Sequence, residues 1–162
     1  MKKKLWVALV VSVMAISAAH AKDTGPYLDA KKVGVKRCLP AVKKLADKIL
    51  ADRVHTSACA WSKSNPDSAV FSCSGVQTWG SQDQFYALSL TPTAKGECVG
   101  EYTQVVRFDG NCEDVRKEYF SSFLVVPERT YIMLSRELVN LHLLPRADGC
   151  SVLKHETILE LK

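Results

Sequence analysis

Six cysteines constrain the fold of this chain more than any other feature of its sequence. They are Cys38, Cys59, Cys73, Cys98, Cys112 and Cys150. No two of them have the spacing of a Cys-x-x-Cys redox motif or a zinc knuckle, and an even number in an exported chain favours disulfides over free thiols. The sequence therefore predicts a disulfide-stabilised domain that folds in an oxidising compartment.

The N-terminus predicts the export that such disulfides need. Residues 2–4 are lysines, residues 5–18 are almost entirely apolar, and Ala19-His20-Ala21 has the small-x-small pattern of a cleavage site. The apolar run is short for a membrane span, so it favours a cleaved signal over an anchor. We expect residues 1–21 to be a signal peptide of bacterial type. The mature protein would be periplasmic or secreted, with no membrane span.

Length and charge indicate one small domain with a slight basic excess. The chain has 162 residues with 22 Lys and Arg against 17 Asp and Glu, and removal of the three signal lysines leaves a mature net charge of +2. A chain of this size normally makes one domain. We expect a flexible N-terminal arm over residues 22–35 and a single domain over residues 36–162.

Changes of hydrophobic period divide that domain into helices and strands. Apolar residues at three- and four-residue steps, from Leu39 to Leu50, predict a helix that begins at Lys36, and a short helix capped by Asn111 is predicted later. Alternation with period two predicts four strands between these helices and two to three strands after them. The strand candidates are Val54–Ser62, Ala69–Trp79, Gln84–Thr91, Cys98–Phe108, Thr130–Ser135, Leu138–Leu144 and Ser151–Glu160. The class is α+β, with a four-stranded antiparallel meander whose apolar face both helices cover.

The turns predict how the cysteines pair. A hairpin about Pro66 places Cys59 opposite Cys73, at a spacing that suits a disulfide. The first helix must run antiparallel to the first strand, so it brings Cys38 to the end of the sheet where Cys98 starts a strand. Cys112 then lies on the order of 30 Å from Cys98, which favours its pairing with Cys150. The main alternative, Cys98–Cys112, would need a hairpin centred inside a good strand.

Two histidines are the candidates for a metal site. A tight turn at Asp148-Gly149 would make His142 and His155 cross-strand neighbours. Two imidazoles can bind a transition metal, but only Glu137 or Glu156 is near in sequence as a third ligand, and Asn140 on the same side favours a polar pair on the solvent face. We therefore expect no metal and no other cofactor, with His142 and His155 as the only candidates.

No motif predicts catalysis. The chain has no Gly-x-Ser-x-Gly elbow, and every cysteine is better explained as a half-cystine. Carboxylates remain as an enzymatic route, through an acid/base pair such as Glu97 and Glu101, or through Glu113, Asp114 and Glu118. The last three also fit ordinary roles in helix capping and surface ion pairs.

Basic residues on the first helix and just before it form the candidate binding surface. They are Lys36, Arg37, Lys43, Lys44 and Lys48. Such a surface can meet an anionic envelope component or an acidic partner, although a solvated helix face explains it too. Aromatic residues do not interleave with the lysines, which disfavours nucleic acid. The stretch Glu118–Tyr131, apolar over Phe120–Val126, is either an edge strand or a loop that offers a hydrophobic patch to a partner, and most of its apolar side chains are expected in the core.

A well-specified scaffold without catalytic motifs favours a binding role. The leading hypothesis is an exported, non-enzymatic protein that binds another protein, as an inhibitor, an immunity-type factor or an envelope accessory factor. One alternative is a small hydrolase of envelope polymers that uses carboxylates or a histidine pair. The other is a carrier whose apolar sheet face and helices enclose a small hydrophobic ligand.

Overall fold

The computed structural model describes residues 23–50, 53–79, 82–126 and 131–161, so the expected signal peptide lies outside it. Within these ranges the chain forms three helices and one eight-stranded antiparallel sheet. The helices are α1 (Gly25–Val33), α2 (Leu39–Leu50) and α3 (Cys112–Tyr119). The strands are β1 (Ala58–Ala60), β2 (Phe71–Trp79), β3 (Gln82–Pro92), β4 (Cys98–Phe108), β5 (Leu124–Val126), β6 (Ile132–Arg136), β7 (Val139–Arg146) and β8 (Gly149–Leu161).

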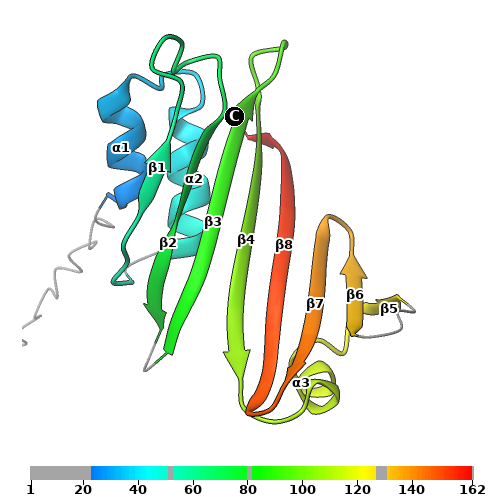
Figure 1. Ribbon diagram of the computed structural model, residues 1–162. Coiled ribbons are helices and arrows are strands. Elements are labelled where there is room, and N and C mark those ends of the chain that lie inside the picture. The colour runs from blue at the N-terminus through cyan, green and yellow to red at the C-terminus, as the bar shows by residue number, and fades with distance from the viewer. Residues whose placement is uncertain (1–22, 51–52, 80–81, 127–130, 162) are drawn as a thin grey trace, which may run out of the picture.

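All eight strands join one sheet in the order β1-β2-β3-β4-β8-β7-β6-β5. Strands β1 to β4 form the predicted meander. From β4 the chain passes through α3 to the opposite edge and returns strand by strand, so that β8 pairs with β4 near the centre (Figure 1). The α+β class is confirmed, with more strand than expected. The stretch after α3 contains a short edge strand, β5, whose Leu124 is 76% exposed.

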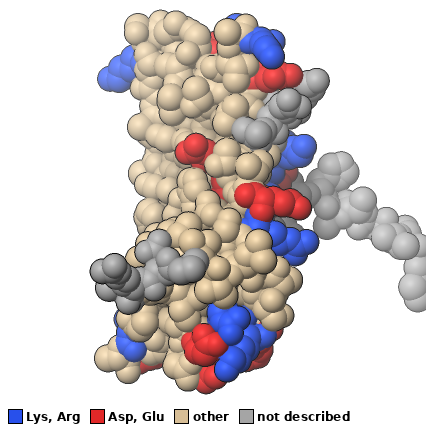
Figure 2. All heavy atoms as spheres, turned by 90° about the vertical axis from the view of Figure 1, so that its right-hand side faces the viewer, with Lys and Arg blue, Asp and Glu red and all other residues tan. Residues whose placement is uncertain are grey.

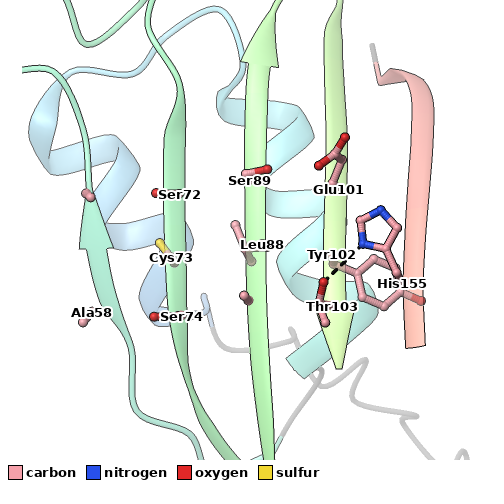
Figure 3. Close-up of a pocket in the computed structure, with 12 residues that line it drawn as sticks. Ala58, Ser72, Cys73, Ser74, Leu88, Ser89, Glu101, Tyr102, Thr103 and His155 are labelled. Atoms are coloured by element: carbon pink, nitrogen blue, oxygen red, sulfur yellow. Dashed lines mark hydrogen bonds between the residues drawn. The ribbon is translucent and has the colours of Figure 1, made fainter. Parts of the chain in front are cut away.

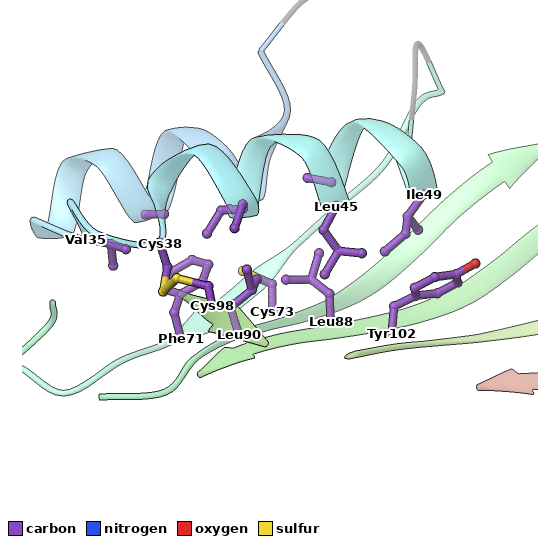
Figure 4. Close-up of a cluster of buried hydrophobic side chains, with 14 of the residues drawn as sticks. Val35, Cys38, Leu45, Ile49, Phe71, Cys73, Leu88, Leu90, Cys98 and Tyr102 are labelled. Atoms are coloured by element: carbon purple, nitrogen blue, oxygen red, sulfur yellow. A yellow bond between two sulfur atoms is a disulfide. The ribbon is translucent and has the colours of Figure 1, made fainter. Parts of the chain in front are cut away.

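The first core lies between α1, α2 and one face of strands β1 to β4. Alternation along the strands turns Leu88 and Tyr102 toward the helices, and Leu45 and Ile49 of α2 lie against this face (Figure 4). All four side chains are at most 3% exposed. Full burial of an aliphatic side chain contributes about 1.5–3 kcal/mol. Packing of this apolar stripe is therefore what holds α2 on the sheet.

Helix α1 occupies a segment for which a flexible arm was expected. Pro26 stands in the first turn, where its missing N–H breaks no helical hydrogen bond, and Gly34 ends the helix with φ of 92°. The N–H of Gly25 donates to Nε2 of His55 at 3.1 Å, and Ala30 is fully buried. The glycines and proline that suggested an irregular arm mark the ends of a helix instead, so the prediction for residues 22–35 was wrong over Gly25–Val33.

A second core lies under α3. Its buried residues are Cys112, Val115, Leu134, Leu141, Leu143, Cys150 and Val152. The predicted cap is confirmed, because the side chain of Asn111 accepts from the N–H of Asp114 at 3.0 Å. The prediction that this helix covers the meander was wrong, since α3 packs on β7 and β8. The apolar residues of the later strands needed their own cover, and α3 is the element that reaches them.

The favoured disulfides are all confirmed. Cys59 pairs with Cys73 across β1 and β2 with Cα atoms 4.1 Å apart. Cys38 joins the start of α2 to the start of β4, and Cys112 joins the start of α3 to the start of β8, with Cα separations of 5.8 and 5.0 Å. Each group of helices is thus tied covalently to the strands that it covers.

Candidate functional site

The three helices leave one face of the sheet uncovered. Directly opposed residues in antiparallel strands share a face, and the pairing runs from Tyr86 through Gln104 and Lys154 to Leu141. Tyr86 belongs to the first core and Leu141 to the second, so both cores lie on one side. No described helix covers the other side, which we call the open face (Figure 1).

One row of side chains, mostly apolar, crosses the open face at right angles to the strands. Pairing partners on six adjacent strands make up this row: Val76, Phe85, Val105, Leu153, His142 and Met133. We call them the apolar row. Neighbouring strands lie about 4.8 Å apart, so the row is roughly 24 Å long.

The apolar row is accessible to solvent along its length. Val76 is 41% and Phe85 is 45% exposed, and the other four members are partly buried. Single exposed apolar side chains are ordinary, whereas contiguous ones mark surfaces that another molecule covers. The row therefore singles out the open face as a candidate binding surface.

A hollow of about 330 Å³ lies beside the apolar row, over strands β1 to β4 and β8. Small side chains form its floor, namely Ala58, Ala60, Ser72, Ser74, Ala87 and Ser89. Glu101, Thr103 and His155 stand on its β4–β8 side (Figure 3). The hollow exists because these small residues are neighbours of the larger Val76 and Phe85 on the same strands. It offers hydroxyl and carboxylate groups next to an apolar strip.

One hydrogen-bonded pair in the hollow, Thr103 and His155, has the residue types of a nucleophile and its base. Nδ1 of His155 and Oγ1 of Thr103 lie 3.2 Å apart across the β4–β8 pairing. A hydroxyl beside an imidazole is the start of a nucleophile–base arrangement, which also needs a third group to orient the imidazole. In the described part of the chain, no hydrogen bond joins Nε2 of His155 to such a group.

The predicted histidine pair does not form. Arg146 pairs with Gly149, so the turn residues are Ala147 and Asp148, and the register differs by two residues from the expected one. His142 lies opposite Leu153, with its ring centroid 5.4 Å from that of Tyr131 in a tilted arrangement, while His155 lies opposite Asn140.

The register of the β7–β8 hairpin follows from Gly149. A Cβ atom at this position would come within 2.3 Å of the carbonyl oxygen of Phe108, and its φ is 145°. The glycine is therefore needed as the first residue of β8, next to β4, and cannot serve as a turn residue. Over the described residues, no group of three metal-binding side chains is found.

The five predicted basic residues are interspersed with acids. Lys43 pairs with Asp47 at 3.0 Å and with Asp23 at 3.5 Å. The backbone N–H groups of Arg37 and Lys36 donate to Asp67 and lower the pKa of its carboxyl.

The remaining two lysines lie on α2. Lys48 pairs with Glu156 of β8, and Lys44 is exposed. Charges of both signs also alternate on the side of the molecule that Figure 2 shows. The structure thus gives each of these cations, apart from Lys44, an acidic neighbour, and a binding role for this surface stays a prediction.

The candidate carboxylates lie in separate places. Glu101 borders the hollow on the open face. On the helix side, Glu113 pairs with Arg116 at 2.5 Å and with Lys117 at 3.7 Å, and Asp114 bonds Asn111 at 2.5 Å. Glu113 and Asp114 thus have the ordinary ion-pair and capping roles, Glu118 interacts with the hydroxyl of Tyr119, and none of the three faces Glu101.

A charged cluster on the helix-covered face was missed at the sequence level. The hydroxyl of Tyr102 donates to Glu156 at 2.5 Å, and Lys154 lies 3.0 Å from the same carboxylate and 2.5 Å from the hydroxyl. Lys48 of α2 donates to the other carboxylate oxygen. Extending the strand alternation to β8 would have placed Glu156 beside Tyr102 on the covered face, which was the available signal.

The cluster perturbs both acidic groups. Burial disfavours the charged form of Glu156, but hydrogen bonds from Lys48, Tyr102 and Lys154 outweigh it and lower its pKa to about 2. Burial and the bond to Glu156 raise the pKa of Tyr102. Glu156 is therefore ionised and Tyr102 is a neutral donor at physiological pH. The ionised carboxylate maintains the ion pair with Lys48 that joins β8 to α2.

Comparison with family models, with curated proteins and with solved structures found no significant match to this chain. Among the described residues, no helix is both long and apolar enough to cross a membrane. The three disulfides are compatible with an oxidising, exported location. The functional argument therefore depends on the geometry of the chain itself.

Proposed function

We propose that this chain is an exported, non-enzymatic protein that binds another protein through the open face of its sheet. It would act in the periplasm or after secretion, as an inhibitor, an immunity-type factor or an envelope accessory factor. The observation that carries the proposal is the apolar row, which crosses six strands on the face that no described helix covers.

The chemistry of the open face suits a protein partner. Protein interfaces combine an apolar centre with a polar rim that supplies hydrogen bonds. The apolar row provides such a centre, and Ser72, Ser74 and Ser89 of the hollow provide hydroxyl groups next to it. Aromatic residues often anchor protein interfaces, and Phe85, at 45% exposure, is the aromatic member of the row.

The rigidity of the sheet supports the same proposal. The central strands β4 and β8 pair over nine residues in register, from Gly100 to Phe108, and disulfides join them to α2 and α3. A rigid surface loses little conformational entropy when it binds, so more of the contact energy appears as affinity.

A photoreactive side chain at position 85 tests the proposal. Benzoylphenylalanine in place of Phe85 is expected to give one adduct of defined mass with exported proteins of the source cells. The same group in place of Lys44, which is exposed on α2, should give no such adduct. Ser74→Arg should remove the adduct at position 85, because a long side chain fills the adjacent hollow.

Two results would contradict binding through the open face. One is an adduct that forms from position 44 and not from position 85. The other is the absence of an adduct at either position while the oxidised protein is folded and present in the exported fraction.

A hydrolase of envelope polymers is the second candidate, and the pair of Thr103 and His155 beside Glu101 favours it. A screen of peptidoglycan, lipid and phosphoester substrates would detect such an activity. This candidate requires the activity to fall at least about a hundredfold in His155→Ala, as expected for loss of a general base. Activity that survives the substitution would exclude the pair.

A further inference from the structure

A wide groove lies on the covered face, between α3 and the centre of the sheet. It is a groove of about 760 Å³, a size that accommodates a small organic molecule. Its lining combines apolar side chains with amides and charges: Gln82, Gln84, Gln104, Val106, Arg107, Phe108, Asp109, Glu118, Tyr119, Phe120, Leu141, Val152 and Lys154. It arises because the two helical groups cover opposite ends of the sheet and leave a gap between them.

The end of the groove near α3 is aromatic. The ring of Phe108 lies 5.1 Å from that of Tyr119 and 6.1 Å from that of Phe120. Tyr119 is 55% exposed. Val106 and Val152, which pair directly across β4 and β8, continue the apolar surface along the floor. This part of the groove can bury a hydrocarbon or aromatic tail.

The other end of the groove is polar and largely buried. Gln84 is 3% exposed and bonds Gln77 at 3.3 Å through one end of its amide. Lys154 lies opposite Gln104, and its ammonium uses two of three N–H groups on Tyr102 and Glu156. One ammonium donor of Lys154 therefore remains for a ligand.

The charge at this end is positive. Lys48 and Lys154 share the single carboxylate of Glu156, which leaves one net positive charge in the cluster. Asp109 and Glu118 border the groove at its α3 end together with Arg107, and all three are exposed to solvent. Two acids outnumber one base there, so an anionic headgroup is attracted to the half-buried Lys154 end rather than to the opposite end, and charge orients the ligand.

We propose that this groove binds an amphiphile with one anionic headgroup, of the chemistry of a medium-chain carboxylate. Its headgroup contacts Lys154, and its tail lies over Val106 and Val152 toward Phe108. This site is on the covered face and is independent of the proposed protein-binding surface. A ligand here and a partner on the open face can be bound at the same time.

Calorimetry with three variants tests the site, with sodium dodecanoate below its micelle concentration as the probe. The oxidised mature protein should bind it in a one-to-one ratio. Lys154→Gln should weaken binding roughly 10-fold or more, because a charge-assisted hydrogen bond is lost. Lys48→Gln is the matched control, because it also removes a bond to Glu156 but lies outside the groove. It removes the same unit of charge from the cluster but keeps the Lys154 donor in the groove, so it should weaken binding only about threefold, clearly less than Lys154→Gln.

Headgroup charge and groove volume complete the test. Dodecyltrimethylammonium, with the same tail and a cationic head, should not compete with dodecanoate. Val106→Trp should abolish binding by filling the floor of the groove, and if it does not fold, the two lysine variants decide the question. The site is refuted by any of three results: no saturable binding of dodecanoate, equal affinities in Lys154→Gln and Lys48→Gln, or equally tight binding of the cation.

Discussion

At the scale of single residues, Glu156 is the clearest link between the sequence and the stability of the fold. Its carboxylate joins β8 to α2 through Lys48 and to β4 through Tyr102. The side chain is only 13% exposed, so solvent screens these bonds weakly. An ionised carboxylate is stable at this half-buried position because three donors surround it. Its pKa of about 2 shows that the charged form is favoured.

The pH dependence of unfolding tests this role. The pKa of Glu156 is about 2 in the folded chain against 4.5 ordinarily, so its contribution is complete above about pH 4.5 and is lost as the pH falls toward 2. That contribution is about 3 kcal/mol at most. Urea unfolding of Glu156→Gln should show a lower free energy at pH 7 and a smaller loss between pH 5 and pH 2.5.

Glu113→Gln provides the control for this measurement. Glu113 is also paired with basic residues and has a lowered pKa, but it lies on the exposed surface of α3. Its removal should leave the pH dependence nearly unchanged. If both variants show the same pH profile as the wild type, Glu156 does not contribute as described.

Gly75 shows how one backbone contact fixes a sequence position. A Cβ atom there would lie 1.9 Å from the carbonyl oxygen of Thr56, so Gly75→Ala must displace the segment that precedes β1. We expect a loss of about 3 kcal/mol in unfolding free energy. Ser74→Ala, on the open face beside it, should change stability by less than about 0.5 kcal/mol. Equal effects of the two substitutions would refute this close approach.

At the scale of elements, two disulfides add to the packing that holds α2 and α3 on the sheet. Cys38–Cys98 spans 60 residues, Cys112–Cys150 spans 38 and Cys59–Cys73 spans 14. The first two connect helices to the sheet, whereas the third connects two strands that are already neighbours. The three disulfides should therefore differ both in how much they contribute to the free energy of unfolding and in the element that each stabilises.

Paired serine substitutions should rank in the order of loop length. In the entropic account, loss of Cys38–Cys98 costs about 4 kcal/mol and loss of Cys59–Cys73 about 3 kcal/mol. Chemical denaturation of Cys38→Ser/Cys98→Ser should give the lower midpoint of the two double variants. A lower midpoint for Cys59→Ser/Cys73→Ser would show that strand geometry, and not loop closure, dominates.

Local patterns predicted the elements whose signals lie within one segment. The α2 stripe, the alternation of β2 to β4 and the cap at Asn111 are all short-range. The disulfides were predicted because the register of one hairpin limited the remaining choices. Helix α1 was missed because Pro26 and Gly34 are read as loop residues unless a helix between them is already assumed.

The candidate site lay beyond sequence reasoning for a different reason. The apolar row depends on the register of six strands, and Val105 meets Leu153 from almost fifty positions away in the chain. The two-residue difference in the last hairpin moved His142 out of its expected pairing. Neither fact follows from a local pattern, because both depend on backbone contacts such as that of Gly149 with Phe108.

At the scale of the whole molecule, the two faces of the sheet have different tasks. The covered face contains both cores, the charged cluster and the groove. The open face contains the apolar row and the hollow. This division allows the open face to vary in chemistry without loss of the fold, which is the property that a binding surface needs.

The double variant Val76→Ser/Phe85→Ser tests that division most directly, with stability and complex formation measured on the same protein. Both side chains are more than 40% exposed, so the variant should unfold within about 1 kcal/mol of the wild type. In sedimentation velocity of exported extracts, it should no longer enter the complex that the wild type forms. A variant that unfolds much more easily, or that still enters the complex, would contradict the assignment of the open face to partner binding.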